Sequence, residues 1–250
     1  MINFKEITEV PEYYLTGCEL SILKAHSEAL INQLKPETVI LEFGSGSSKK
    51  TRTIIEAFIK IHKKCTYIPI DISGEMLVQS ANELLVDYNE LKVIALHGTY
   101  DDALKYIAAN WAEKSKLLLF LGSSVGNLKL SEALIFLKKI RESIFFFFDG
   151  FLKCFKGFTP NDKLLIGIDL MKDEQILKPA YHDPGLITEK FMLNLLTRMN
   201  RELDANFNLS NFKLEIELQH SRENDVGRIE SYIKSLQDQR HEFVFQKFYF

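Results

Sequence analysis

A short glycine turn is the first feature of the sequence that could hold a ligand. Gly44, Ser45 and Gly46 follow an apolar run, and Lys50 comes where apolar residues begin to recur at helical spacing. Glycines let a ligand approach the backbone closely, and the start of a helix offers free N–H groups to an anion. Lys49 stands where a dinucleotide-binding turn carries its third glycine. This disfavours a pyrophosphate ligand and a nicotinamide oxidoreductase, and leaves room for another adenosyl ligand.

Polar residues also follow the next three apolar runs. Asp71 could accept hydrogen bonds from both hydroxyls of a ribose, or it could cap the next helix. Thr99 and Tyr100 could lie beside an adenine or form an ordinary turn. Gly122 and Asn127 could let a substrate pass close to the backbone and hold it through the amide, although a tight turn explains the glycine equally well.

These residues lie at the ends of expected strands. Apolar runs at 38–43, 66–70, 92–96, 116–121 and 163–169 alternate with helical patterns at 49–61, 75–86, 101–109 and 131–141. Such alternation predicts βαβ units and an α/β fold with a doubly wound, mainly parallel sheet. The carboxyl ends of parallel strands share one edge of a sheet, where open α/β sheets bind their ligands. The glycine turn and the polar residues are therefore expected to gather there.

Further elements flank this core. Thr16 and Glu19 read as the capping box of a helix that ends before Pro36. A helix is expected at 185–202, followed by antiparallel strands at 212–218 and 228–236 that could cover the ligand edge.

Composition limits the class of protein. The 250 residues are 46% hydrophobic and 26% charged with a net charge of -3, which is ordinary for one large globular domain with a small appendage. The charge balance gives no footprint for nucleic acid or for an anionic membrane. Three widely spaced cysteines indicate structural thiols in a reducing compartment. No apolar segment reaches the ~18 residues of a membrane span, so a cytoplasmic protein is expected.

Five segments together resemble the histidine-specific, S-adenosylmethionine (SAM)-dependent methyltransferase family. They lie at 11–16, 41–52, 120–127, 167–173 and 200–207, and the resemblance covers nearly all of residues 4–236. It implies a Rossmann-like class I methyltransferase that transfers methyl groups to the α-amine of an amino acid, first of all L-histidine, in ergothioneine biosynthesis. It also implies a sulfoxide-forming partner domain or protein in the same pathway. A dimethylallyltryptophan-type indole amino acid is the alternative substrate, and a non-catalytic truncated relative is the alternative from another class.

The resemblance assigns roles to particular residues. The residues implied to bind the cofactor are Gly44, Ser45, Gly46, Lys50, Asp71, Thr99 and Tyr100, with Lys50 pairing with the amino-acid carboxylate and Asp71 binding the ribose. Those implied to bind the substrate are Tyr13, Gly122, Asn127 and Tyr181. Tyr13 is the expected catalytic contact, as an orienting hydrogen-bond group near the amine. No metal or nucleophilic side chain is required, because the sulfonium already activates its methyl group.

The expected organisation is an N-terminal helical substrate segment at 1–37, a SAM-binding Rossmann-like domain at 38–184 and a partial substrate-binding lid at 185–250. The chain departs from the family at both ends, which are expected to be truncated, and in a Phe-rich insertion at about 143–159. We hypothesise that the insertion and the Phe-rich C-terminal end are a gene-model fault. The alternative is a genuine insertion that packs as a hydrophobic hairpin or forms an interface.

Overall fold

The computed structural model describes residues 4–141, 144–148, 151–155, 161–220 and 227–242. The chain forms two compact units: one combines Met1–Tyr14 with Leu170–Phe250, and the other is Leu15–Asp169. The sequence placed the divisions at 37/38 and 184/185 instead. Leu23 and Ile31, from the first long helix, are buried in the same apolar cluster as Ile40 of the sheet, so this helix belongs with the sheet.

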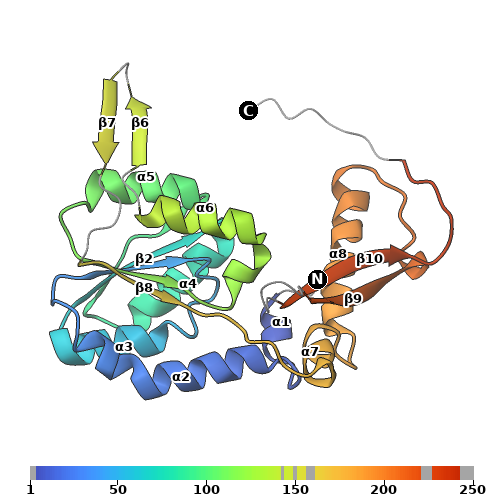
Figure 1. Cartoon of the computed structure of the whole chain (residues 1–250), viewed down its shortest axis with the longest axis horizontal. Coiled ribbons are helices and arrows are strands. Elements are labelled where there is room, and N and C mark those ends of the chain that lie inside the picture. The colour runs from blue at the N-terminus through green and yellow to red at the C-terminus, as the bar shows by residue number, and fades with distance from the viewer. Residues whose placement is uncertain (1–3, 142–143, 149–150, 156–160, 221–226, 243–250) are drawn as a thin grey trace. The chain divides into compact units, whose positions relative to one another are not determined.

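The unit Leu15–Asp169 is built on a parallel sheet (Figure 1). Its strands run in the order β3-β2-β1-β5-β8. The short β4 pairs with the last residues of β2, and β3 pairs with the first residues of β2. Their bounds are β1 Val39–Phe43, β2 Cys65–Asp71, β3 Leu91–Val93, β4 Leu96–His97, β5 Lys116–Phe120 and β8 Lys163–Ile166. All pairs in this sheet are parallel. The predicted doubly wound, mainly parallel fold is confirmed, with β1 and β5 as the central pair where the strand order reverses.

Helices cover both faces of this sheet. They are α2 Tyr14–Ile31, α3 Arg52–His62, α4 Gly74–Asp87, α5 Tyr100–Asn110, the short η1 Ser124–Asn127 and α6 Leu130–Arg141. Successive strand residues point to opposite faces: Ile40 packs with residues of α2, α3 and α4, whereas Leu41 packs with residues of α5 and α6. Because β1 is buried on both faces, its sequence is a nearly continuous apolar run.

Some expected elements differ from the structure in their bounds. The expected strand at 92–96 is divided into β3 and β4, and β8 ends at Ile166. The capping box at Thr16 and Glu19 is wrong, because α2 already begins at Tyr14 and Thr16 lies inside it. Glu19 is used elsewhere, by Lys50 and by the backbone N–H of Gly122.

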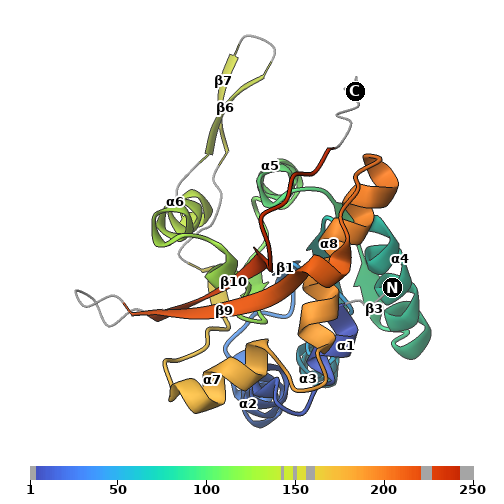
Figure 2. The same ribbon diagram turned by 90° about the vertical axis from the view of Figure 1, so that its right-hand side faces the viewer.

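The second unit contains helices and an antiparallel strand pair. Its elements are α1 Phe4–Thr8, α7 Glu174–Tyr181, α8 Ile187–Glu202, η2 Leu209–Asn211, β9 Phe212–His220 and β10 Gly227–Ser235. Figures 1 and 2 show β9 beside α8, and the Leu214 N–H of β9 donates to Glu189 of α8 (3.0 Å). The expected helix and strand pair are confirmed, while the sequence missed α1 and α7.

The Phe-rich insertion contains two paired strands. β6 Ile144–Phe148 and β7 Phe151–Phe155 form an antiparallel hairpin, the conformation that the genuine-insertion alternative predicted. Residues 142–143, 149–150, 156–160 and 243–250 lie outside the described part of the chain. The gene-model hypothesis for the insertion and for the C-terminal end therefore stays a prediction.

Candidate adenosyl-binding site at the carboxyl edge of the sheet

The glycine turn lies at the carboxyl end of β1, as the sequence predicted. Gly44 and Gly46 both have positive φ, +68° and +50°, a backbone conformation that favours glycine. The N–H groups of Gly44 (2.9 Å) and Ser45 (3.2 Å) donate to the carbonyl of Ile70 in β2, which fixes the turn to the neighbouring strand. The Ser45 hydroxyl is buried without a hydrogen-bond partner among the described residues.

Asp71 ends β2 beside this turn. One carboxylate oxygen accepts from the Gly46 N–H and the other from the Ser73 N–H, both at 2.9 Å. The sequence left two roles open for Asp71, a ligand contact and a helix cap. The structure is compatible with both, because Asp71 accepts an N–H at the start of α4 and also one from the glycine turn. Ser73, rather than Asp71, is the N-cap of α4. A carboxylate has about four acceptor positions, and the described residues use two of those of Asp71.

Thr99 and Tyr100 differ in their surroundings. Thr99 is the exposed N-cap of α5 in a capping box with Asp102, as the ordinary-turn reading allowed. The half-buried Tyr100 ring packs on Phe43, with the ring centroids 4.8 Å apart. Its hydroxyl lies 3.1 Å from where a Cβ on Gly44 would be. Burial, and then the charge of Asp71, raises the pKa of Tyr100, so this hydroxyl stays protonated at the same edge.

Lys50 has a partner that the sequence did not indicate. Its ammonium pairs with the Glu19 carboxylate of α2, and the Gly122 N–H donates to both oxygens of the same carboxylate (2.9 and 3.0 Å). Gly122, with φ +72°, follows β5, next to β1 in the sheet. Lys50 and Gly122 were predicted to bind the cofactor and the substrate respectively, and both donate to the same Glu19 carboxylate.

A second carboxylate that sequence reasoning missed lies under the turn. Glu42 is 3% exposed and accepts from the Thr51 hydroxyl (2.7 Å) and from Tyr67. The Tyr67 hydroxyl also contacts Ser48 Oγ at 3.0 Å. Burial raises the pKa of Glu42 from 4.5 to about 7, although the hydrogen bonds from Tyr67 and Thr51 oppose this. The signal available in the sequence was a carboxylate inside an otherwise apolar strand.

The remaining predicted substrate residues lie in both units. Asn127 is exposed at the end of η1 in the sheet unit. Tyr13 and Tyr181 belong to the other unit and come together, with ring centroids 6.1 Å apart and ring planes at 74°. The ammonium of Lys172 lies 4.7 Å from the ring centroid of Tyr14, a second aromatic contact that the sequence did not indicate.

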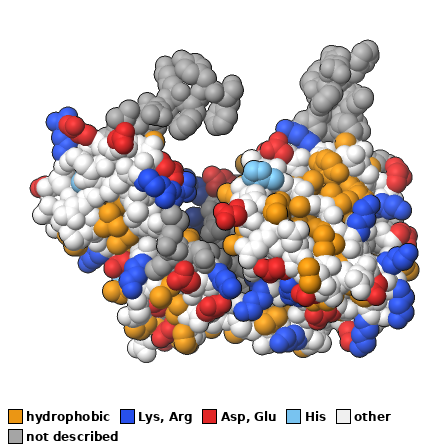
Figure 3. All heavy atoms as spheres, turned by 180° about the vertical axis from the view of Figure 1, so that it is seen from behind, with side chains coloured by type: hydrophobic (Ala, Val, Ile, Leu, Met, Phe, Trp, Pro, Cys, Tyr) orange, Lys and Arg blue, Asp and Glu red, His pale blue; other side chains and the backbone are white. Residues whose placement is uncertain are grey.

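The surface and the helices agree with the composition. Figure 3 shows Lys and Arg interspersed with Asp and Glu over the visible face. Among the described residues, no helix is both long and apolar enough to span a membrane.

Cys18 is exposed and Cys65 is buried, and neither forms a disulfide. Burial raises the pKa of Cys65 to about 12, which makes this thiol unreactive.

A parallel sheet with a glycine turn after β1 and a carboxylate at the end of β2 defines a Rossmann-like protein, a class whose members bind ligands at the carboxyl edge of the sheet. Comparison with known families makes this more specific. The profile of the family described as "Histidine-specific methyltransferase, SAM-dependent" matches residues 2–249. The chain belongs to this SAM-dependent methyltransferase family.

Similar curated proteins carry related names. A histidine N-alpha-methyltransferase of Mycobacterium tuberculosis is 33% identical over 84% of this chain and 60% of its own length. Ergothioneine biosynthesis protein 1 of Neurospora crassa is 35% identical over 79% of this chain and 21% of its own length. A 4-dimethylallyltryptophan N-methyltransferase of Claviceps fusiformis is 27% identical over 75% of this chain and 50% of its own length. The chain thus spans less than two thirds of the length of these relatives.

Proposed function

We propose that this protein is a SAM-dependent N-methyltransferase that acts on the α-amine of L-histidine. The observation that carries the proposal is the convergence of Gly44, Gly46, Asp71 and Tyr100 at one edge of the sheet. The choice of histidine is supported by the name of the Mycobacterium tuberculosis relative, a histidine N-alpha-methyltransferase. It is more similar to this chain than the 4-dimethylallyltryptophan N-methyltransferase of Claviceps fusiformis.

The residues at this edge fit the parts of the cofactor. The Asp71 carboxylate has acceptor positions left for the ribose hydroxyls, and the glycine turn allows close approach of a ligand to the backbone. The Ser45 hydroxyl is buried and has no hydrogen-bond partner in the described part of the chain, so the turn could accommodate a further polar group. Lys50 supplies a positive charge for the carboxylate of the methionyl part.

When bound, SAM supplies a methyl group that its sulfonium activates. The protein must then orient the amine, exclude water and hold the amine unprotonated. We assign the orienting contacts to Tyr13 and Tyr181, whose rings lie close together, and to Gly122 and Asn127. Tyr13 acts as a hydrogen-bonding group. Thr99 contributes to the adenine side by fixing the start of α5 before Tyr100.

We extend the proposal to the setting of the enzyme. The ergothioneine-related name of the Neurospora crassa protein, of which this chain matches 21%, supports a sulfoxide-forming partner domain or protein in the same pathway. The cytoplasm is the compartment we propose, from the cysteine usage and the charge balance.

The test is calorimetric binding of S-adenosylhomocysteine, with and without L-histidine. We expect micromolar binding, on the order of -8 kcal/mol, that L-histidine tightens and that Asp71→Ala abolishes. Glu28→Gln is the matched control, because Glu28 is an exposed carboxylate on α2 that pairs only with Lys60 among the described contacts. Tightening by 4-dimethylallyltryptophan but not by L-histidine would favour the indole substrate. A folded protein that binds no S-adenosylhomocysteine would refute the enzyme and leave a non-catalytic relative.

A further inference from the structure

Glu19 reaches from helix α2 to the carboxyl edge of the sheet. Its carboxylate pairs with the Lys50 ammonium and accepts the Gly122 N–H on both oxygens, at 2.9 and 3.0 Å. The Glu19 and Lys50 side chains are only 16% and 22% exposed. One carboxylate therefore joins the segment after the glycine turn to the segment after β5, across the central pair of strands.

Two glycines provide the space for this contact. A Cβ on Gly167, just after β8, would overlap Glu19 Oε1, and a Cβ on Gly122 would lie 2.9 Å from Lys50 Nζ. Any larger residue at Gly167 would displace the carboxylate, because real Cβ atoms do not approach other atoms so closely. The backbone that follows two neighbouring strands, β5 and β8, thus leaves room for the Glu19 and Lys50 side chains.

Lys50 keeps donors for a ligand in this arrangement. An ammonium group has three N–H donors, and among the described residues Lys50 donates to Glu19 alone. The Lys side chain is long and flexible, and a fixed partner removes much of its rotamer freedom before a ligand arrives. The Gly122 N–H holds the Glu19 carboxylate independently of Lys50. Glu19 can therefore stay in place when Lys50 acquires a second anionic partner.

We infer that Glu19 is a positioning residue for the cofactor's amino-acid group, and that it acts by holding the Lys50 ammonium in its binding position. The inference rests on the proposed function, because it names the residue that prepares Lys50 for the methionyl carboxylate. The competing possibility is that Glu19 occupies the place of that carboxylate and must be displaced. The two possibilities predict opposite changes in affinity when the charge of Glu19 is removed.

Another pair on the same helix shows why this contact differs from an ordinary salt bridge. Glu28 pairs with Lys60 of α3 at 2.5 Å, but these side chains are 60% and 67% exposed, so little is gained from the pair. It also lacks a backbone N–H contact among those found for the described residues. Glu28→Gln therefore removes one carboxylate of α2 and its ion pair with Lys60, without touching the edge of the sheet.

The experiment measures S-adenosylhomocysteine affinity for the full chain, Glu19→Gln, Lys50→Met, the double variant and Glu28→Gln. Glutamine keeps an oxygen that can accept the Gly122 N–H, but it lacks the negative charge that Glu19 presents to Lys50. We expect Glu19→Gln to weaken binding at least about tenfold, the factor that corresponds to ~1.4 kcal/mol. We expect less than about a twofold effect of Glu19→Gln in the Lys50→Met background, because coupled residues are non-additive. Glu28→Gln should bind like the wild type.

A second ligand separates positioning from general damage to the fold. 5′-Methylthioadenosine lacks the amino-acid part of the cofactor, so Glu19→Gln should leave its affinity unchanged. Unchanged or tighter S-adenosylhomocysteine binding by Glu19→Gln would overturn the inference, and tighter binding would show that Glu19 competes with the ligand. An equal loss for both ligands would also overturn it. Absence of binding by the wild type would refute the proposed function and this inference with it, whereas wild-type binding with additive substitutions would refute the inference alone.

Discussion

The buried Glu42 carboxylate makes protein stability depend on pH in a predictable direction. Burial raises its pKa from 4.5 to about 7, so the folded protein retains this proton at pH values where the unfolded chain has lost it. Stability from this group is therefore fully present below about pH 4.5 and is lost as the pH rises through about 7. Each tenfold change in acidity is worth about 1.4 kcal/mol, so the full loss is about 3 kcal/mol.

Glu42→Gln tests this reasoning, because glutamine has nearly the same shape and cannot ionise. We expect the free energy of unfolding of the variant, relative to the wild type, to rise by about 2 to 3 kcal/mol between pH 5 and pH 8. Urea denaturation at a series of pH values measures this difference directly. Glu28→Gln, at an exposed carboxylate, should follow the wild-type profile. If the profiles of Glu42→Gln and the wild type are parallel over this range, Glu42 does not titrate in the folded protein near pH 7 and the argument is refuted.

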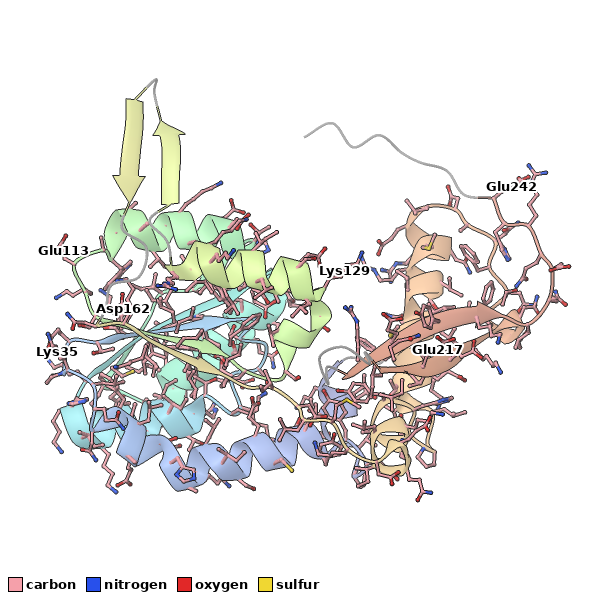
Figure 4. All side chains as sticks on the ribbon, in the orientation of Figure 1. Lys35, Glu113, Lys129, Asp162, Glu217 and Glu242 are labelled. Carbon is pink, nitrogen blue, oxygen red and sulfur yellow. The ribbon has the colours of Figure 1, made fainter. Side chains whose placement is uncertain are left out.

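Three further predictions concern other parts of the sheet unit. Asp162, labelled in Figure 4 and placed just before β8, forms a fully buried ion pair with Lys116 (3.2 Å). Asp162→Ala should therefore lower the free energy of unfolding by about 3–5 kcal/mol in denaturant, because it leaves a buried charge without its partner; a loss below about 1 kcal/mol would contradict this. Thr99→Ala removes the α5 capping box with Asp102 and should cost about 1 kcal/mol, as measured by thermal unfolding, and an unchanged midpoint would show that the cap contributes nothing. Gly44→Ala would place a Cβ at a position of positive φ, 3.1 Å from the Tyr100 hydroxyl. The loss of binding free energy for S-adenosylhomocysteine should exceed the loss of unfolding free energy; a larger loss of unfolding free energy would place the role of this glycine in folding alone.

The alternation of strands and helices in the sheet unit could be predicted, because the sequence patterns that cause it are local. Buried parallel strands read as apolar runs, and the helices between them carry apolar residues at helical spacing. Gly44 and Asp71 could be placed at one edge from topology alone, since the carboxyl ends of parallel strands coincide. The errors were also local in origin. Thr16 and Glu19 match a capping box by type and spacing, yet the chain around Tyr14 is already helical and Glu19 is bound by Lys50.

The sequence by itself determined the family and the parallel sheet, and it placed the glycine turn and Asp71 at one edge of that sheet. The tertiary structure decided which polar groups act together, because side chains distant along the chain meet only after folding. Glu19 and Gly122 are 103 positions apart, and Glu42 and Tyr67 are 25 apart. A buried carboxylate must find donors wherever packing brings them. No local pattern specifies those partners, so the contact of Glu19 with Lys50 and the raised pKa of Glu42 emerge from the fold alone.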